Sequence, residues 1–337
     1  MARERQTSEN EYLETWTVEP GEAGSRLDLF LKEKYRRLSR EYIQRYIKAG
    51  KVTINQESSK PSRILRVKDK VAVLSVRKEE PEVDFNYKIL FEDAHVLVVD
   101  KPGNLPVHPT GRYFFHSLLM QLRIVNGNEV DQMKDFFIVH RIDRETSGVL
   151  VMGKTKEAAA SLVNQFETRV PQKKYLAIIK GNPAWEKIEI DAPLAKDPHA
   201  EIKLKMHVAE LGPDGEPLYL PKSEILSAST QIEVVERLKN YTVVRCKPHT
   251  GRQHQIRVHL DHVGHPIVGD KLYGVEAEMF IKNIIKAVSI EIEPGVRLSR
   301  HALHAASLEF KHPATGKMMK VESGFPPELE EFLEKVR

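Results

Sequence analysis

The sequence contains a single cysteine, Cys246, among its 337 residues. One thiol excludes an internal disulfide and any zinc site built on several thiolates. Long apolar runs are absent as well, since none approaches the ~20 residues of a membrane-spanning helix. Residues 1–14 lack the apolar stretch of a secretory signal, and neither a phosphate-binding loop nor a dinucleotide fingerprint follows. We therefore expect a cytoplasmic protein that uses no membrane, no metal and no cofactor.

The net charge is also small, because 52 Lys and Arg residues stand against 48 Asp and Glu residues, a formal charge of +4. The cations are concentrated between Arg26 and Lys51, where only Asp28, Glu33 and Glu41 oppose them. The basic residues inside this segment are Lys32, Lys34, Arg36, Arg37, Arg40, Arg45 and Lys48. Such a segment can present a basic surface to phosphates, although a solvated helical face has the same composition.

Two short helices are predicted in this segment, after a polar and flexible tail at residues 1–15. Ser25 is expected to cap the first helix and Ser39 the second, and Gly50 to end the second in a left-handed conformation. Apolar residues at the i, i+3, i+4 spacing give each helix a stripe that can be buried. These residues are Leu27, Phe30 and Leu31 in the first helix, and Ile43, Tyr46 and Ile47 in the second.

The outer face of the second helix is basic. Arg40, Gln44 and Lys48 fall at i, i+4 and i+8 on one outward stripe, with Arg45 close by. The strand-like runs KVTIN and DKVAVLSV then close a small unit, for which we predict the bounds 16–78. Its run SREYIQRYIKAGKVTIN resembles an S4 RNA-binding domain. With this resemblance, Arg40, Arg45 and Lys48 are interpreted as RNA contacts.

The pattern changes after an acidic, Pro-containing stretch, which we interpret as a linker at residues 79–87. Short β-rich runs beyond it indicate strands, and TKEAAASLVNQFETR indicates an amphipathic helix. The strand-like runs are HVLVVDK, FFIVHR, GVLVMGK, KKYLAIIKG, TQIEVVERL and YTVVRCK. Residues 88–325 are thus predicted to form one α+β domain around an extended, mixed and largely antiparallel sheet flanked by helices. We further predict a long insertion at Ala195–Thr230 and a C-terminal helix at 326–337.

The first segment that suggests chemistry is His140–Gly148, in which Asp143 lies between Arg141 and Arg144. Flanking arginines lower the pKa of a carboxyl group and keep it ionised, so Asp143 is suited to act as a nucleophile rather than as an acid. A surface salt bridge followed by a turn would show the same residues.

The second segment, KKYLA, begins an apolar strand on which Lys173, Tyr175 and Ala177 share one face. On a cleft face, the ring of Tyr175 can stack on a base and its phenolic oxygen can take part in chemistry. On an inner face, Tyr175 would be a core residue.

The third segment is His249–Leu260. Thr250 and Gln253 have the spacing of a capping box, so a helix is predicted to begin here with Ile256 facing inward. Arg257, one residue further round, would lie at the margin of the core, where a partly desolvated arginine needs a carboxylate partner. The histidines at positions 254, 259, 262 and 265 suggest a metal site, but no cysteine or well-placed Glu completes one.

Five motifs follow one another along the chain: VVDKPGNLPVHP, HRIDRETSG, KKYLA, GRQHQIRVHL and HPIVGDKLYG. Their order and approximate spacing resemble the RluA-type RNA pseudouridine synthases, and the likeness covers nearly all of residues 88–325. The preceding S4-like unit fits the two-domain form of that family.

The resemblance also implies roles for individual residues. They are Asp143 as the catalytic aspartate, Arg257 as its partner, Tyr175 as the residue that stacks on the target base, Arg141 as the residue that takes the place of the flipped uridine, and Arg252 as a contact to RNA or to the active site. The departures from the family pattern are Ile142, where leucine is commoner, and Gln253, where threonine or serine is.

The implied reaction detaches uracil from C1′ of its ribose, turns it and reattaches it through C5, without net redox change or hydrolysis. We expect ribosomal RNA slightly ahead of transfer RNA as the substrate, and a monomer without an obligatory protein partner. Two other classes stay open. One is a non-catalytic RNA-binding protein with the same fold, and the other is a glycosidase or base deaminase, for which the sequence offers neither a second catalytic carboxylate nor a zinc-deaminase signature.

Overall fold

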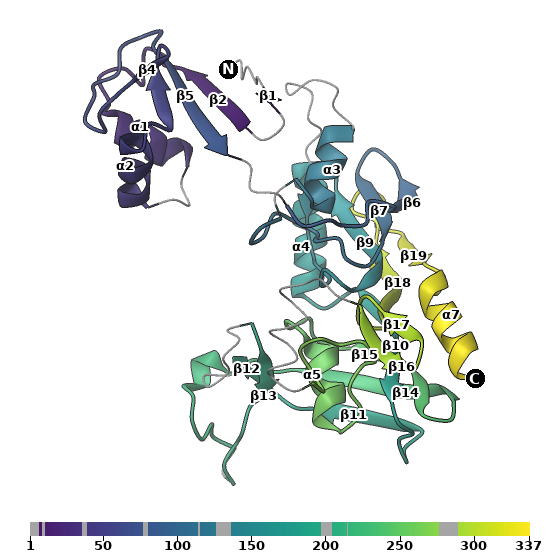
Figure 1. The fold of residues 1–337 in the computed structure, drawn as a ribbon. Coiled ribbons are helices and arrows are strands. Elements are labelled where there is room, and N and C mark those ends of the chain that lie inside the picture. The colour runs from purple at the N-terminus through teal and green to yellow at the C-terminus, as the bar shows by residue number, and fades with distance from the viewer. Residues whose placement is uncertain are drawn as a thin grey trace. The chain divides into compact units, whose positions relative to one another are not determined.

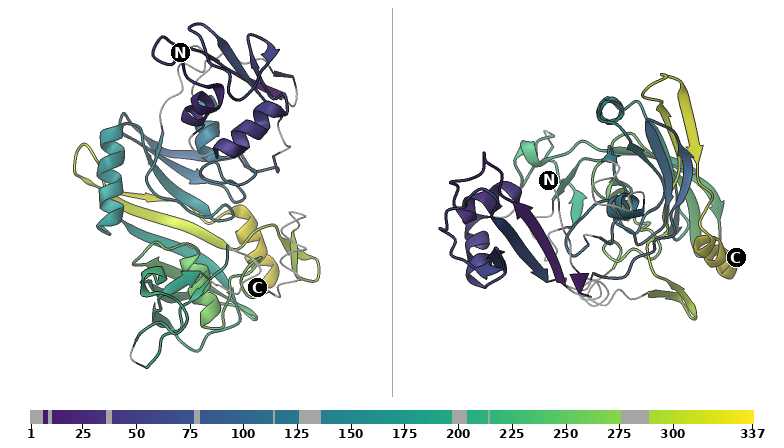
Figure 2. Two further views of the ribbon diagram at one scale, coloured as in Figure 1. Left: turned by 90° about the vertical axis from the view of Figure 1, so that its left-hand side faces the viewer. Right: turned by 90° about the horizontal axis from the view of Figure 1, so that it is seen from above.

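Apolar side chains gather in two parts of the chain, and each part has a core of its own. The computed structural model describes residues 7–8, 11–35, 39–76, 80–113, 115–125, 136–196, 204–213, 215–275 and 289–337. Arg36 and Arg37 of the basic segment lie outside these ranges. The chain divides into an N-terminal unit, whose main segment is Met1–Pro81, and a larger unit formed by Glu82–Arg123 and Lys134–Arg337 (Figures 1 and 2).

The N-terminal unit packs two helices against an antiparallel sheet with the strand order β1-β2-β5-β3-β4. Its elements are β1 (Thr7–Ser8), β2 (Glu11–Thr17), α1 (Leu27–Lys34), α2 (Arg40–Lys48), β3 (Val52–Ile54), β4 (Glu57–Ser58) and β5 (Lys70–Val76). The predicted helical stripes are buried in its core, with Leu27, Phe30, Leu31, Ile43 and Ile47 at most 3% exposed. This helix-and-sheet arrangement confirms the predicted small α+β unit.

The predicted bounds of this unit need two corrections. The flexible tail expected at residues 1–15 is wrong from residue 11 onward, because β2 begins at Glu11 and pairs with β5 along its whole length. Part of the linker expected at residues 79–87 belongs to the larger unit, where Val83 and Tyr87 pack against a hydrophobic cluster. The error in the tail arose because the strand β2 pairs with β5, which is distant in the chain. The error in the linker arose because polar residues surround Val83 and Tyr87, whose hydrophobic partners are also distant in the chain.

The helix caps are partly as predicted. Ser39 is the N-cap of α2, and its Oγ accepts a hydrogen bond from the backbone N–H of Tyr42 at 3.2 Å. Gly50 adopts the expected left-handed conformation with φ +72°. Ser25 does not cap α1, whose N-cap is Arg26 without a side-chain capping bond.

The basic face of α2 is less uniform than its helical spacing suggested. The buried carboxylate of Asp28, on α1, accepts hydrogen bonds from three side chains: Arg26, Arg40 and Gln44. Gln44 therefore turns inward and does not belong to the outward stripe. Arg40 is half exposed and already paired with Asp28, whereas Arg45 and Lys48 are exposed.

The larger unit is built on a ten-stranded sheet, with the order β11-β14-β15-β10-β18-β9-β7-β6 and with β19 and β8 paired to β18 and β9. Its strands are β6 (Lys88–Glu92), β7 (Val96–Lys101), β8 (Phe137–Ile138), β9 (Ser147–Gly153), β10 (Gln172–Lys180), β11 (Lys187–Asp191), β14 (Ser229–Arg237), β15 (Tyr241–Pro248), β18 (Leu303–Lys311) and β19 (Met318–Glu322). The β18 to β9 pairing is parallel and the other pairings are antiparallel. The predicted mixed, largely antiparallel sheet is confirmed.

Alternation along the strands buries both faces of this sheet. On β7, Leu97 and Val99 join a cluster with α3 (Leu118–Val125), while Val96 and Val98 join another with α4 (Lys156–Glu167). Because successive side chains of a strand point to opposite faces, the two helices cover opposite faces of the sheet. The predicted amphipathic helix is α4.

Two further helices cover the other half of the sheet, one on each face (Figure 1). His259 of α5 (Gln255–His262) contacts Thr230 of β14 with 2.9 Å between Nδ1 and Oγ1. Phe332 of α7 (Pro327–Val336) packs edge-on against Tyr241 of β15. Tyr175 pairs with Cys246 across the sheet and so lies on the α5 face.

Smaller elements complete the larger unit. The insertion predicted at Ala195–Thr230 contains the end of β12 (Leu194–Lys196), β13 (Met206–Val208) and the 3₁₀ helix η2 (Lys222–Glu224). It packs through Met206 and Ala228 on the α5 residue Val258. A hairpin of β16 (Ile290–Glu293) and β17 (Val296–Leu298) precedes β18. The C-terminal helix predicted at 326–337 is α7, and it is part of the core.

Candidate active site

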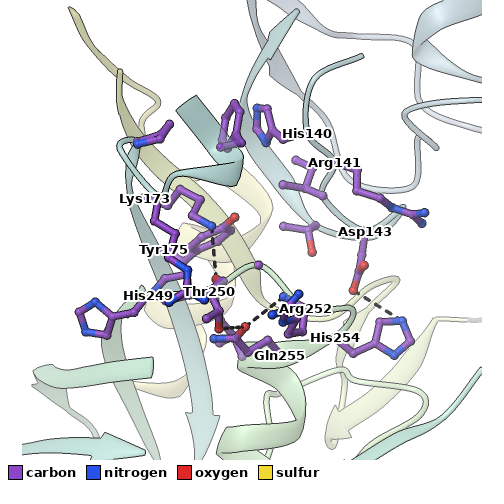
Figure 3. A pocket seen from close by; sticks show the side chains of 18 of the residues that line it. His140, Arg141, Asp143, Lys173, Tyr175, His249, Thr250, Arg252, His254 and Gln255 are labelled. Atoms are coloured by element: carbon purple, nitrogen blue, oxygen red, sulfur yellow. Dashed lines mark hydrogen bonds and ion pairs between the residues drawn. The ribbon is translucent and has the colours of Figure 1, made fainter. Parts of the chain in front are cut away.

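A cavity of about 590 Å³ opens in the larger unit (Figure 3). Its walls come mainly from residues 139–146, 163–175 and 248–257, which include parts of the three segments that the sequence singled out. The five residues of this unit to which the motifs assigned roles all line it: Arg141, Asp143, Tyr175, Arg252 and Arg257. The fold thus brings together residues that lie up to 116 positions apart in the chain.

Arg257 is the centre of the polar network beneath the cavity. Its Nη1 donates to Oδ2 of Asp143 at 2.9 Å. Its Nε and Nη2 donate to the two carboxylate oxygens of Asp270 at 2.6 and 2.9 Å. Asp270 also accepts from the backbone N–H groups of Leu272 and Tyr273. The carboxylate of Asp270 therefore holds the guanidinium group in place through two hydrogen bonds, and the guanidinium group in turn donates one hydrogen bond to Asp143.

The charges of this network keep Asp143 ionised. Burial by itself would raise the pKa of Asp143, but the nearby positive charge of Arg257 outweighs it and lowers that pKa below its ordinary value. The pKa of Asp270 is likewise lowered, because Arg257 outweighs the burial of this carboxylate. Asp143 is 23% exposed at its side chain and Asp270 is fully buried, so only Asp143 can meet a ligand.

His254 lies on the other side of Asp143. Its Nε2 is 3.9 Å from Oδ2 of Asp143, and its Nδ1 is 2.9 Å from the phenolic oxygen of Tyr273. That oxygen accepts from the backbone N–H of Met206, so its own proton is free to go to Nδ1. Burial lowers the pKa of His254 to about 4, which leaves the ring neutral near pH 7. In the tautomer that accepts the hydrogen bond of Tyr273 at Nδ1, the proton of the neutral ring is on Nε2 and faces Asp143.

Two buried side chains bind the backbone of the loop that carries Asp143. The buried Lys101 donates from Nζ to the carbonyl oxygen of Arg144 at 3.0 Å. The buried Arg300 donates from Nη1 to the next carbonyl oxygen, that of Glu145, at 3.1 Å. A Cβ at Gly103 would lie 2.1 Å from Cδ of Arg300, so only glycine leaves room for this side chain. Two buried basic side chains thus fix the peptide groups that directly follow Asp143.

Side chains of the same loop are fixed as well. Glu145 accepts from Lys271 at 2.8 Å and from Arg144 at 2.9 Å. The hydroxyl groups of Thr146 and Ser147 lie 2.8 and 2.9 Å from ring nitrogens of His301 and His304. Gly148 has φ +111°, and a Cβ there would lie 2.2 Å from the backbone of Ala305 on β18. The loop is therefore rigid before any substrate arrives.

Tyr175 forms part of the cavity wall and is also packed against two hydrophobic clusters. Burial raises its pKa, and the negative charge of Asp143 raises it further, so the phenol is protonated near pH 7. The structure combines the two alternatives that its strand position allowed. One part of the ring packs with the core, and another part faces the cavity.

The remaining predicted contacts differ in their surroundings. Arg141 is exposed at the cavity, and no described residue pairs with its guanidinium. Arg252 donates from Nε to the backbone oxygen of Ser227 at 3.1 Å. His140 stacks on Phe166 with 4.4 Å between ring centroids, and burial lowers its pKa to about 3. Arg40, Arg45 and Lys48 belong to the N-terminal unit, which is described separately above.

The predicted capping box at the start of α5 is wrong. The helix begins at Gln255, and its N-cap is His254 in the left-handed conformation with φ +56°. Gln255 rather than Gln253 closes the turn, because its Oε1 accepts from the hydroxyl group of Thr250 at 2.6 Å and from the backbone of Arg252 at 3.0 Å. Ile256 faces inward as predicted.

Several residues of the site were not found from the sequence. Asp270 supplies the carboxylate that Arg257 was predicted to need, in addition to Asp143. Its position in the motif HPIVGDKLYG was the available signal. His254 was considered only as a metal ligand. Lys101 lies in the motif VVDKPGNLPVHP but was given no role there, and Arg300 lies in none of the five motifs. The partners of both side chains are distant backbone oxygens.

Within the described parts of the chain, no cluster of three or more His, Cys, Asp or Glu side chains is placed to hold a metal ion. A search of the described helices finds none that combines the length and apolarity needed to cross a membrane.

A mixed sheet that carries an ionised, arginine-bound aspartate in a cavity, together with a small α+β unit with a basic helix, defines the class of RNA-modifying enzymes that the motifs resemble. The family model of RNA pseudouridylate synthase matches residues 95–262, and that of the S4 domain matches residues 25–71. The chain belongs to the RNA pseudouridine synthase family and is thus an isomerase that acts on RNA. The resemblance stated from the five motifs is thereby confirmed.

Individual relatives are similar over almost the whole chain. Ribosomal large subunit pseudouridine synthase C of Escherichia coli (strain K12) is 33% identical over 327 residues, which cover 94% of each chain. Ribosomal large subunit pseudouridine synthase D of Xanthomonas campestris pv. campestris is 33% identical, over 94% of this chain and 90% of its own. The solved structure of human RNA Pseudouridylate Synthase Domain Containing 4 is 26% identical, with a TM-score of 0.56 over 74% of this chain and 92% of its own.

Proposed function

We propose that this protein converts uridines of large-subunit ribosomal RNA to pseudouridine, with Asp143 as the catalytic carboxylate. The observation that carries the proposal is the ionised carboxylate of Asp143, held by Arg257 on the wall of a cavity of about 590 Å³. A cavity of this volume is in the range that binds small ligands, such as one flipped nucleotide. The names of the curated relatives support ribosomal RNA as the substrate.

The reaction requires three steps from the residues of this chain. Asp143 either attacks C1′ of the ribose or removes a proton from the sugar, and both routes release uracil as an anion. The base then turns and bonds to C1′ through C5. In the first route C5 displaces the carboxylate of Asp143 from C1′, and in the second the protonated Asp143 returns its proton to the sugar, so the carboxylate is regenerated in both. Loss of the C5 proton restores the aromatic ring and is balanced by the proton that N1 takes up, so no oxidant, reductant or water is consumed.

The other residues of the cavity support these steps. Arg257 holds one oxygen of Asp143 and leaves the other free to react. Tyr175 is placed to stack on the flipped base, and its protonated phenol can take the C5 proton only as a relay that passes its own proton on at the same time. The exposed Arg141 is proposed to fill the space that the flipped uridine leaves, and Arg252 to contact the RNA.

All the proposed catalytic groups come from one chain, which supports action as a monomer without an obligatory protein partner. A ribosomal RNA substrate also supports a cytoplasmic location. The proposed RNA contacts of the N-terminal unit are Arg40, Arg45 and Lys48, of which Arg40 is additionally bound to Asp28.

The substrate proposal is tested by mapping pseudouridines across total RNA from cells with and without this protein. Sites that disappear from large-subunit ribosomal RNA, and return on re-expression, are the expected result. If sites disappear only from transfer RNA, then transfer RNA and not ribosomal RNA is the substrate. An unchanged map, together with purified protein that forms no pseudouridine, would favour a non-catalytic RNA-binding protein.

Substitution of Tyr175 should separate stacking from proton transfer. Tyr175→Ala removes the ring, and since stacking of one base contributes about 1–3 kcal/mol, RNA affinity should fall. Tyr175→Phe keeps the ring, so affinity should stay near wild type while the single-turnover rate falls about 10²-fold or more through the missing O–H group. Normal turnover by Tyr175→Phe would exclude a role of the phenol in proton transfer. Normal affinity and normal turnover of Tyr175→Ala would exclude both roles and leave Tyr175 as a core residue only.

Removal of the exposed cations of α2 should weaken RNA binding in a salt-dependent way. For Arg45→Gln with Lys48→Gln, the slope of log affinity against log salt should become shallower by roughly 0.7–0.9 for each lost phosphate contact. The matched control is Lys335→Gln with Arg337→Gln, which removes two exposed cations from the C-terminal helix region. Equal slopes for the two double variants would mean that Arg45 and Lys48 form an ordinary solvated face.

A further inference from the structure

The cavity contains a lysine that the proposed chemistry does not use. Lys173 lies on the wall of the cavity, two residues before Tyr175 on β10 (Figure 3). Its Nζ donates a hydrogen bond to the backbone oxygen of Thr250 at 3.3 Å. A Cβ at Gly251 would lie 3.3 Å from this Nζ, so the glycine leaves space around the ammonium group. The ammonium group has three donors, and the contact to Thr250 uses one of them.

Lys173 also has no anionic partner among the residues that the structure describes. No carboxylate among the described residues forms an ion pair with it, whereas its neighbour Lys174 on the opposite strand face pairs with Glu309 at 3.4 Å. Burial lowers the pKa of Lys173. A half-buried cation without a counter-ion is unfavourable for folding, because it loses hydration without gaining an ion pair. A bound anion would supply the missing charge.

The rest of the cavity also favours an anion. The lining residues with positive charge are Arg141, Arg169, Lys173, Arg252 and Arg257, and those with negative charge are Asp143 and Glu167. Arg257 is shared between Asp143 and the buried Asp270, so these three residues together carry one negative charge. Arg141, Arg169, Lys173 and Arg252 then outnumber this charge and that of Glu167. RNA brings one negative charge with each phosphate, so a nucleotide that enters this cavity carries the charge that its wall lacks.

We propose that Lys173 binds a phosphate group next to the target uridine and so anchors the flipped nucleotide over Asp143. The inference rests on the proposed function, since it takes a flipped uridine as the occupant of the cavity. A phosphate fits better than a carbonyl oxygen of uracil, because a neutral oxygen would leave the positive charge uncompensated. The phosphate contact also explains why this position is a lysine, which binds phosphate as a point charge, without a rigid fork of donors.

The test compares four variants in binding to an unmodified transcript of the large-subunit ribosomal RNA. They are Lys173→Met, Lys173→Gln, Lys173→Arg and the matched control Lys174→Met. Affinities are measured over a range of salt concentrations in an Asp143→Asn background, so that turnover does not change the RNA. Single-turnover rates at saturating enzyme are measured with Asp143 present.

Lys173→Met and Lys173→Gln should both bind about tenfold more weakly, with a slope of log affinity against log salt reduced by about 0.7. Lys173→Arg should restore the slope, and Lys174→Met should leave it unchanged. The thermal midpoint of Lys173→Met should stay equal or rise, because an unpaired cation has been removed from a partly buried position. A structural role for the amine would lower that midpoint.

Two outcomes would overturn the phosphate contact. The first is weaker binding by Lys173→Met with an unchanged salt slope, together with normal affinity of Lys173→Gln, whose amide is a neutral donor. This result would mean that the lysine binds a neutral oxygen. Unchanged affinity with a slower single-turnover rate would mean that it acts in the chemistry. Neither outcome depends on the role of Asp143, which is tested separately by product formation in the Asp143→Asn variant.

Discussion

Asp143→Asn should fold, bind RNA and form no measurable pseudouridine. Asparagine keeps the shape of the side chain, and its amide oxygen can still accept the hydrogen bond that Nη1 of Arg257 donates at 2.9 Å. The amide can neither attack C1′ nor take a proton from the sugar. Loss of an essential nucleophile lowers turnover by several orders of magnitude, so we expect a fall of at least about 10³-fold in the single-turnover rate. Activity within tenfold of wild type would refute the role of Asp143.

The matched control is Asp270→Asn, which changes the other carboxylate bound to Arg257. Asp270 is fully buried and accepts two bonds from Arg257 and two from backbone N–H groups. Its neutral amide can accept through one oxygen only, so this variant should lose more stability than Asp143→Asn. Free energies of unfolding from urea titrations distinguish the two. A stable, active Asp143→Asn with an inactive Asp270→Asn would exchange the proposed roles of the two residues.

The strands and helices could be predicted because their signals are local. On β7 the apolar run VLVV is buried on both faces, and on α4 the apolar residues recur at helical spacing. The sheet order was not predictable in the same way. The parallel contact between β9 and β18 joins residues 157 positions apart, His304 and Ser147, and no local pattern specifies that pairing.

The site was predicted where one residue type had an unmet chemical need. The position of Arg257 beside a buried isoleucine required a carboxylate, and the structure provides Asp143 and Asp270. Lys101 and Arg300 created no such requirement, because they bind the backbone oxygens of Arg144 and Glu145. A backbone oxygen is present at every position of a chain, so the sequence alone did not indicate which two oxygens these side chains bind.

The largest effect on stability should come from Arg257→Met. Methionine fills much of the space of the aliphatic stem but leaves the buried Asp270 without its cation. Removal of one partner from a buried ion pair typically costs about 3–5 kcal/mol, because the other charge remains buried and uncompensated. The matched control is Arg337→Met, which breaks an exposed pair with Glu236 and should cost at most about 1 kcal/mol. The two substitutions remove the same group and differ in the burial of its partner.

Urea titration measures this difference best in a Trp16→Phe background. The chain has two tryptophans, of which Trp16 belongs to the core of the N-terminal unit and Trp185 to the larger unit. Fluorescence of Trp185 then follows only the unit that contains Arg257. Equal free energies of unfolding for Arg257→Met and Arg337→Met would show that Asp270 does not depend on Arg257 for its charge.

Arg257→Met should also move the pH dependence of catalysis, provided that the protein is assayed where it remains folded. In the wild type, burial raises the pKa of Asp143 and the charge of Arg257 lowers it by more, so the carboxylate is ionised above its ordinary pKa of 3.8. Without Arg257 the largest of the effects that oppose burial is lost, and the pKa of Asp143 should rise. A depressed pKa in the folded state stabilises the fold above the unfolded pKa, and this stabilisation is lost as pH falls through the folded pKa. The variant lacks this contribution to the stability of the fold near neutral pH. In its pH profile, the acid limb of the single-turnover rate should lie at higher pH than in the wild type. A lower plateau with an unmoved acid limb would mean that Arg257 orients Asp143 without controlling its ionisation.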